Sequence, residues 1–142
     1  MPACFADTSF WIALSSKRDE HHARALAWSR YVSRTETQIL TTEAVLWEWM
    51  NAFSDSTIRQ LAAAAYHRCH RDPQIEVVPF HADLIAAAVQ LYDARHDKEW
   101  SLTDCLSFIV MERWHVAQAL TTDHHFRQAG YKVVLGNSPL DL

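Results

Sequence analysis

Glycine is scarce in this chain, whose 142 residues include only Gly130 and Gly136. A glycine-rich loop that cradles phosphate groups is therefore excluded, and with it the P-loop and dinucleotide-binding classes of protein. The three cysteines, Cys4, Cys69 and Cys105, are odd in number and form no CxxC pair. We predict that they are reduced, buried side chains.

Positive charge is also in short supply, because the formal net charge is −4 and the isoelectric point is about 6.1. A broad electropositive surface is not expected, which argues against tight nonspecific binding of nucleic acid but not against a nuclease. The first residues contain neither a basic region nor a long apolar run, so no secretory or membrane segment is expected. Together with reduced cysteines, this predicts a cytoplasmic protein.

The composition that remains is globular, with 49% hydrophobic and 21% charged residues. The length suits one domain spanning residues 1–142. Short apolar runs predict strands at Ala3–Ala6, Gln38–Thr41, Ile75–Val78, Val116–Leu120 and Tyr131–Leu135. Helical spacing predicts helices at Ser9–Leu14, Glu20–Ser33, Glu43–Phe53, Ser56–His70, His81–Asp93, Thr103–His115 and, for one turn, His124–Gln128. This alternation predicts an α/β domain with a mainly parallel central sheet flanked by helices.

Four acidic residues, Asp7, Glu43, Asp104 and Asp123, each begin or end one of these segments. Asp7 and Asp123 follow predicted strands, whereas Glu43 and Asp104 lie in the first turns of predicted helices. Because sites in parallel sheets form outside the carboxyl ends of the strands, we expect these carboxylates to meet at one edge. Four unneutralised carboxylates would repel one another, and a divalent metal would remove that cost. Metal held by carboxylates is typical of phosphodiester chemistry.

Helix capping is the alternative explanation for each acid taken alone, because acids in a first helical turn interact well with the helix dipole. Ser101 and Asp104 resemble a capping box with Asp in place of Glu. Thr122 and Asp123 could cap the short turn that follows them, and Thr42 is the expected N-cap of the helix that begins at Glu43. Four acids at one edge favour the metal site over four independent caps.

Weaker candidates stand beside these acids. Ser9 and Thr103 are hydroxyls that could support an acid or bind water, while His125 could orient an acid or touch a phosphate. Arg127 could contact backbone phosphates, although a solvated position is the ordinary role of such a residue. His67 and His70 share a helix face, but we interpret them as solvent-exposed or core histidines because no third metal ligand is evident nearby.

The segments around the four acids resemble the PIN-domain family and, within it, the VapC ribonuclease toxins of bacterial toxin–antitoxin pairs. The resemblance covers nearly the whole chain. It rests on Phe5–Leu14, on Thr42-Glu43 with its helix to Phe53, on Ser101–Cys105 and, most specifically, on Thr121–Tyr131.

This resemblance implies a five-stranded parallel sheet and Mg²⁺ or Mn²⁺ held by Asp7, Glu43, Asp104 and Asp123. It also implies endonucleolytic cleavage of structured RNA such as tRNA or rRNA, a homodimer, and an antitoxin that occupies the active-site groove. The apolar helices at Ala44–Phe53 and Ile58–Tyr66 are candidate surfaces for the dimer or the antitoxin. If metal-activated water from solvent attacks the phosphorus, the products carry 5′-phosphate and 3′-hydroxyl ends.

Three other classes of protein compete with this interpretation. An aspartyl-phosphate phosphatase or a phospho-receiver domain would use Asp7 as its phosphorylated residue. The phosphatase usually has a second acid at the position that Ser9 occupies here. The receiver domain would need paired acids after the first strand and a lysine after the last strand, and neither is present. Trapping with beryllofluoride would distinguish both from a nuclease. A catalytically silent module that keeps the fold for protein contacts is the third class, and an absence of Mn²⁺ binding would favour it.

Overall fold

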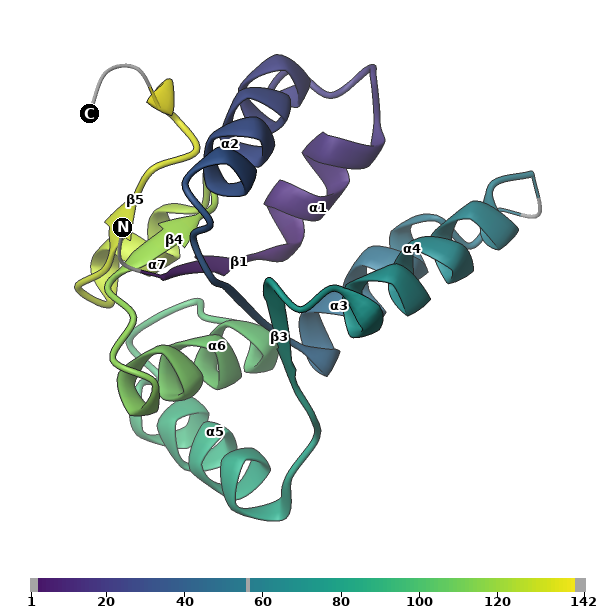
Figure 1. Ribbon diagram of the computed structural model, residues 1–142. Coiled ribbons are helices and arrows are strands. Elements are labelled where there is room, and N and C mark those ends of the chain that lie inside the picture. Colours follow the sequence, from purple (N-terminus) through teal and green to yellow (C-terminus); the bar gives the residue numbers. More distant parts are fainter. Residues whose placement is uncertain (1–2, 56, 140–142) are drawn as a thin grey trace.

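The sheet has five strands, all parallel, and the predicted α/β architecture is confirmed (Figure 1). The computed structural model describes residues 3–55 and 57–139. The strand order is β3-β2-β1-β4-β5. In chain order the strands are β1 (Cys4–Ala6), β2 (Ile39–Thr42), β3 (Ile75–Val78), β4 (Gln118–Leu120) and β5 (Lys132–Val133).

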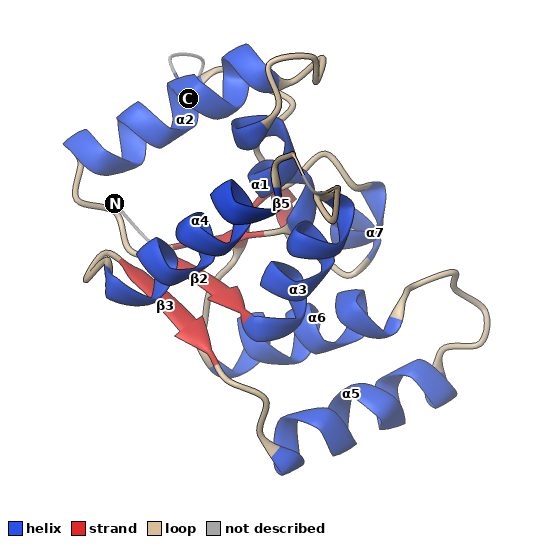
Figure 2. Ribbon diagram, turned by 90° about the vertical axis from the view of Figure 1, so that its right-hand side faces the viewer, coloured by secondary structure: helices blue, strands red, loops and turns tan. Residues whose placement is uncertain are grey.

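Helices connect the strands and cover the sheet. Helices α1 and α2 lie on one side of it, α5 and α6 pack together on the other, and α3 and α4 extend from its end (Figures 1 and 2). Their bounds are α1 (Thr8–Ser15), α2 (His22–Arg34), α3 (Glu43–Ala52), α4 (Arg59–Arg71), α5 (Ala82–Ala94), α6 (Leu102–Arg113) and α7 (His124–Gln128). No helix in the described parts of the chain is long and apolar enough to cross a membrane.

The predicted boundaries of α4 and β5 differ from those in the structure, because local hydrogen bonds near their first residues form turns that the apolar pattern does not indicate. The helix expected from Ser56 begins at Arg59 as α4, because Asp55 Oδ1 accepts from the backbone N–H of Thr57 at 2.8 Å and forms a turn first. Ser56 itself lies outside the described residues. Strand β5 starts at Lys132 rather than at Tyr131, since the N–H of Tyr131 bonds to Phe126 O at 3.0 Å and so closes the preceding helical turn, and it ends at Val133, before the predicted Leu135.

The central strand β1 is fully buried, with Cys4, Phe5 and Ala6 all at 0% exposure. Both faces of such a strand are covered by helices, which explains why its sequence is a continuous apolar run rather than an alternating one. The prediction of three buried, unpaired cysteines is confirmed. Because β1 pairs with β2 on one side and β4 on the other, the residues that follow these three strands are brought to one edge of the sheet.

A cluster of aromatic side chains fixes α7 against the sheet. The ring of Phe126 is fully buried, with its centroid 6.1 Å from that of Phe5 and 5.0 Å from that of Phe108. This packing holds in place the short helix that directly follows Asp123.

Truncation of this aromatic anchor should destabilise the protein strongly. We expect Phe126→Ala to lower the free energy of unfolding by about 3–5 kcal/mol, because it leaves a cavity in the core. Urea unfolding followed by circular dichroism measures the change. Phe80→Ala is the matched control, since Phe80 is 45% exposed and its loss should cost less than about 1 kcal/mol. Equal losses for the two variants would contradict the anchoring role of Phe126.

Candidate active site

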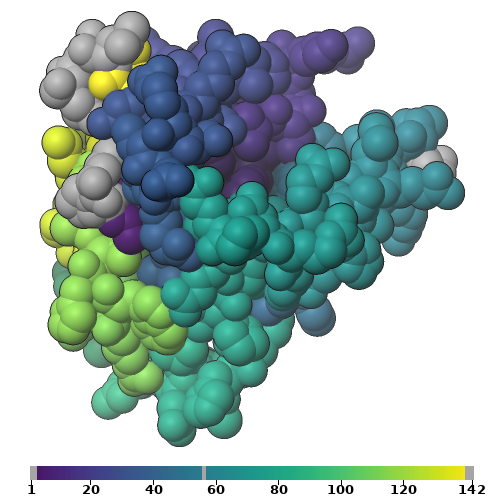
Figure 3. All heavy atoms as spheres, in the orientation of Figure 1, coloured from purple at the N-terminus to yellow at the C-terminus, as the bar shows by residue number. Residues whose placement is uncertain are grey.

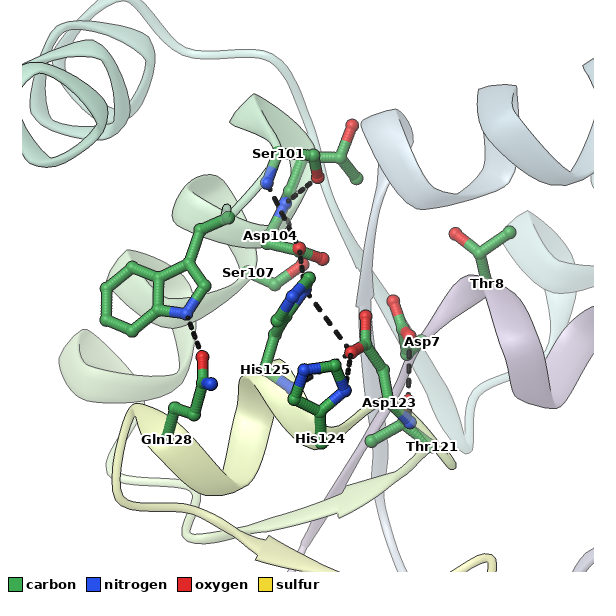
Figure 4. A network of polar contacts seen from close by, with 12 residues as sticks. Asp7, Thr8, Ser101, Asp104, Ser107, Thr121, Asp123, His124, His125 and Gln128 are labelled. Carbon is green, nitrogen blue, oxygen red and sulfur yellow. Dashed lines mark hydrogen bonds and ion pairs between the residues drawn. The ribbon is translucent and has the colours of Figure 1, made fainter. Parts of the chain in front are cut away.

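Three aspartates from distant parts of the chain meet at the carboxyl edge of the sheet (Figure 4). Asp7 follows β1, Asp123 lies between β4 and α7, and Asp104 is in the first turn of α6. The charges of Asp104 and Asp123 both contribute to raising the pKa of Asp7. The edge therefore gathers like charges, as the sequence predicts for these three residues.

Asp7 is the most perturbed member of this group. Its side chain is buried, at 6% exposure for the residue, and burial is the largest cause that raises its pKa from 3.8 to about 7. A hydrogen bond from Thr121 opposes the shift, whereas the charges of Asp104 and Asp123 add to it. Although Asp7 precedes α1 at the N-cap position, its carboxylate faces Thr121, so helix capping does not explain why an acid is placed here.

A short chain of hydroxyl groups supports Asp7. Thr121 Oγ1 donates to Asp7 Oδ2 at 2.8 Å and accepts from the N–H of Asp123 at 3.0 Å. Ser9 Oγ lies 3.0 Å from Thr121 Oγ1 and accepts from the N–H of Thr122 at 3.3 Å. Because the one hydroxyl hydrogen of Thr121 is used in its hydrogen bond to Asp7, the hydroxyl of Ser9 is the donor in the Ser9–Thr121 hydrogen bond. Ser9 thus acts on Asp7 through Thr121 in this arrangement.

Asp104 has a structural role in addition to its place at the edge. Ser101 and Asp104 form the predicted capping box: Asp104 N–H donates to Ser101 Oγ at 3.0 Å, and Ser101 N–H donates to Asp104 Oδ2 at 3.2 Å. Burial is the largest cause that raises the pKa of Asp104. The hydrogen bond from Ser101 lowers it, the charge of Asp123 raises it, and His125 lowers it. The cap and the acidic cluster therefore use the same carboxylate.

His125 bridges two of the acids. Its Nδ1 lies 3.2 Å from Asp104 Oδ2 and 3.3 Å from Asp123 Oδ1 (Figure 4). Ionised carboxylates only accept hydrogen bonds, so with both acids ionised Nδ1 carries the proton. Asp123 Oδ1 also accepts from the N–H of His125 at 2.9 Å and caps α7, as expected. Ligand atoms of Asp123, His124 and His125 all lie within 4.8 Å of one another.

Glu43 lies at the same edge of the sheet, but its partners come from another element. Its carboxylate accepts from the hydroxyl of Tyr66, at 3.1 Å to Oε1 and 2.9 Å to Oε2. His70 Nε2 lies 2.6 Å from Glu43 Oε1. Partial burial, followed by the hydrogen bond and charge of Glu43, raises the pKa of Tyr66, so its hydroxyl stays protonated as a donor. Thr42 caps α3 as predicted, by accepting from the N–H of Val45 at 3.1 Å.

The remaining predicted residues lie at the margin of this arrangement. Thr103 is half-buried and lines an apolar groove of about 330 Å³ together with Trp47 and Phe80. Arg127 is exposed on α7. Within the described part of the chain, the ion pairs of the four acids involve histidines and no lysine or arginine.

Three partners of the acids carried no assigned role in the sequence: Thr121, Tyr66 and His70. Thr121 stands two residues before Asp123, and its signal is a hydroxyl at the end of a strand that neighbours β1. Tyr66 and His70 lie on α4, more than twenty positions after Glu43, so only the packing of α4 on α3 brings them there. The interpretation of His70 as an exposed or core histidine missed this contact.

The donor set suits a divalent cation. A buried carboxylate with two further carboxylates beside it is costly when ionised, and no fixed cationic side chain among the described residues offsets that cost. Carboxylate oxygens are the ligands that Mg²⁺ and Mn²⁺ prefer, and an imidazole also suits Mn²⁺. The residues therefore fit such an ion.

With this geometry established, comparison with known families defines the class: the chain belongs to the PIN-domain family, whose model matches residues 4–131. Within that family it is of the VapC type. It is similar to the 23S rRNA-specific endonuclease VapC20 of Mycobacterium tuberculosis, found in two strains, at 31% identity over 128 residues. That match covers 89% of this chain and 94% of VapC20.

Solved structures agree with the family. The crystal structure of Mycobacterium tuberculosis VapC20, described as a sarcin–ricin loop cleaving toxin, superposes with a TM-score of 0.80 at 26% identity and covers 93% of this chain and 98% of that one. The structure of FitAcB from Neisseria gonorrhoeae gives a TM-score of 0.65 at 16% identity, with 94% and 96% covered. This second likeness supports the fold alone.

The raised pKa of Asp7 predicts how stability depends on pH. Between about pH 4 and pH 7 the folded, metal-free protein holds a proton that the unfolded chain has lost, so the free energy of unfolding falls as the pH rises through this window. Asp7→Asn removes the ionisation. We expect it to be more stable than the wild type by on the order of 2–4 kcal/mol above pH 7, with the difference vanishing near pH 4.

Urea unfolding in EDTA across this pH range measures the effect. Asp93→Asn, a change at an exposed acid on α5, is the control and should stay within about 0.5 kcal/mol of the wild type. If the free energies of unfolding of Asp7→Asn and the wild type differ by the same amount at every pH, the pKa of Asp7 is not raised by folding and this prediction is wrong.

Proposed function

We propose that the protein is a metal-dependent endoribonuclease, the toxin of a toxin–antitoxin pair, and that it hydrolyses phosphodiester bonds in structured RNA. The observation that carries the proposal is the buried Asp7 with Asp104 and Asp123 around it, where residues 3–55 and 57–139 supply no fixed cation to offset them. The relation to VapC20 supports ribosomal RNA as the substrate class, and its sarcin–ricin loop as the first RNA to test.

The proposed ion is Mg²⁺ or Mn²⁺, held by Asp7, Asp104 and Asp123, with Glu43 as the fourth acid. Bound there, the ion would act as a Lewis acid toward the phosphodiester oxygens and facilitate ionisation of water. Asp7 contributes a buried carboxylate whose orientation Thr121 fixes at 2.8 Å. Because the hydrogen bond and the acid both lie in a part of the site shielded from water, the geometry at Asp7 is well defined before any ion arrives.

The side chains on α7 support a role beside the metal. The Nδ1 of His125 is held between two carboxylates, which fixes the ring orientation. Exposed Arg127 follows two residues later and is free to meet a phosphate of the RNA backbone. Ser9 supports Thr121, and Thr103 lines the groove next to the acids, where it could contact substrate.

An antitoxin and a second copy of the chain are the proposed partners, and the proposed place of action is the cytoplasm, where ribosomes lie. Exposed apolar side chains support such contacts: Trp47 is 56% exposed on α3 and Leu61 is 71% exposed on α4. The α4 segment protrudes from the body of the molecule (Figure 3). Residues 1–142 are proposed to act as one domain.

RNA cleavage by this protein should depend on a divalent metal and on the carboxylates that hold it. Purified protein incubated with ribosomal RNA and tRNA in Mg²⁺ or Mn²⁺ should give discrete fragments, and EDTA should abolish them. We expect Asp7→Asn and Asp104→Asn each to lower the cleavage rate by at least about 100-fold while keeping the fold, because ligation of the ion needs the charge and the core does not.

End-group analysis of the fragments sharpens this test. The expected products carry 5′-phosphate and 3′-hydroxyl ends, and Asp93→Asn should cleave like the wild type. Wild-type activity in folded Asp7→Asn, or a 2′,3′-cyclic phosphate end, would refute the proposed chemistry. An absence of both cleavage and Mn²⁺ binding by calorimetry would favour the silent protein-binding module.

The partner surface gives a separate prediction. If α3 and α4 carry the dimer contact, Leu61→Glu should shift the protein toward a monomer in size-exclusion chromatography with light scattering, because a charge in an apolar contact is costly. Val89→Glu is the control, since Val89 is also exposed, at 47%, but lies on α5. An unchanged mass for Leu61→Glu, or an equal effect of Val89→Glu, would exclude this assignment.

A further inference from the structure

The carboxylate of Glu43 is held from outside the acidic cluster, by two side chains that α4 contributes. We propose that Tyr66 and His70 are positioning residues that fix this carboxylate in the orientation the metal-dependent reaction needs. This inference rests on the proposed function and assigns to α4 a part in it.

The contacts define the orientation of the carboxylate completely. The Tyr66 hydroxyl is shared between the two oxygens of Glu43, at 3.1 and 2.9 Å, while His70 Nε2 approaches Oε1 at 2.6 Å. One donor alone would let the carboxylate rotate about its terminal torsion, which is soft. Two donors from different directions remove that freedom and leave Oε2 with the weaker set of partners.

The two donors are themselves held together. Tyr66 and His70 are four residues apart on α4 and therefore lie on the same face of the helix. Their ring centroids are 4.7 Å apart, so each ring restricts the other. Helix α4 packs on α3, the helix that begins with Glu43. The clamp is thus built on two rigid elements rather than on loops, which is what precise positioning requires.

Core packing accounts for only part of this pair, since Tyr66 packs against the core from its edge and His70 does not. The side chain of His70 is 37% exposed and Tyr66 is only half-buried, whereas Glu43 beneath them has a side-chain exposure of 12%. The core contribution of this part of α4 comes instead from Cys69, at 5% exposure. The hydroxyl of Tyr66 and the Nε2 of His70 are both directed at one carboxylate, and this shared direction is what core packing leaves unexplained.

A carboxylate fixed in this way keeps its direction at the strand edge. Removing the donors leaves Glu43 able to turn away, or to move closer to the aspartates and add to their repulsion. Groups that orient the ligands of a metal site typically change metal affinity or activity by 10–100-fold when they are replaced. Tyr66 and His70 would act at that level without touching the ion or the RNA.

Variants that remove one donor at a time test the proposal. We expect Tyr66→Phe, which deletes only the hydroxyl, and His70→Ala each to lower kcat on ribosomal RNA by about 10-fold with KM changed by less than about 3-fold. The double variant should bind Mn²⁺ about 10-fold more weakly by calorimetry. His70→Gln, which can still offer an N–H near the position of Nε2, should recover most of the loss. Tyr92→Phe and His96→Ala, at exposed positions, are the matched controls.

A double-mutant cycle with Glu43→Gln separates positioning from any independent effect. If Tyr66 and His70 act through Glu43, their replacement should change kcat by less than about 2-fold in the Glu43→Gln background. A full 10-fold loss in that background, or wild-type kcat and Mn²⁺ affinity in the folded double variant, overturns the proposal. Thermal unfolding of each variant shows that the fold is kept.

The outcome distinguishes this inference from the proposed function. Cleavage by the wild type that is lost in Asp7→Asn but unaffected by the α4 variants removes only the positioning role. A wild type that neither cleaves RNA nor binds Mn²⁺ removes both.

Discussion

Burial of one carboxylate at the end of the central strand constrains much of this molecule. Asp7 directly follows a strand that is covered on both faces, so its charge cannot be solvated as an exposed acid would be. The surrounding groups respond to that constraint. Thr121 donates to Asp7, Ser9 lies against Thr121, and the backbone of the β4–α7 connection is tied to the same hydroxyls. The packing of the Phe126 ring against Phe5 and Phe108 then holds α7, which carries His124 and His125, against the body of the protein. A divalent cation is the natural complement of this arrangement.

The sequence predicts the sheet because its signals are local. A fully apolar run such as Cys4–Ala6 that stops at an acid is typical of a buried parallel strand, and capping residues such as Thr42 and Ser101 mark helix starts within a few positions. The place of Asp7, Glu43 and Asp123 follows from the same rule, since residues after parallel strands share an edge. These parts of the fold need no knowledge of how one helix packs on another.

What the sequence could not predict depends on packing between helices. Tyr66 and His70 carry no local sign that they meet Glu43, because the contact exists only once α4 lies along α3. Likewise, an Asp-His-His run does not indicate that His125 Nδ1 will sit between Asp104 and Asp123, whose distance is set by α6 and α7 together. Polar side chains without a regular period are placed by tertiary structure, so pattern reasoning leaves them undetermined.

The strand order has a consequence for when the site comes into being. The neighbour of β1 that brings Asp123 is β4, the fourth of the five strands in chain order. Chains are synthesised from the N-terminus, so β1, β2 and β3 are all made before β4 is available to pair with β1. Until then Asp7 lacks both Thr121 and Asp123. The acidic cluster therefore cannot assemble until β4 and the residues that follow it have been synthesised, so the central strand gains its two neighbours at different times.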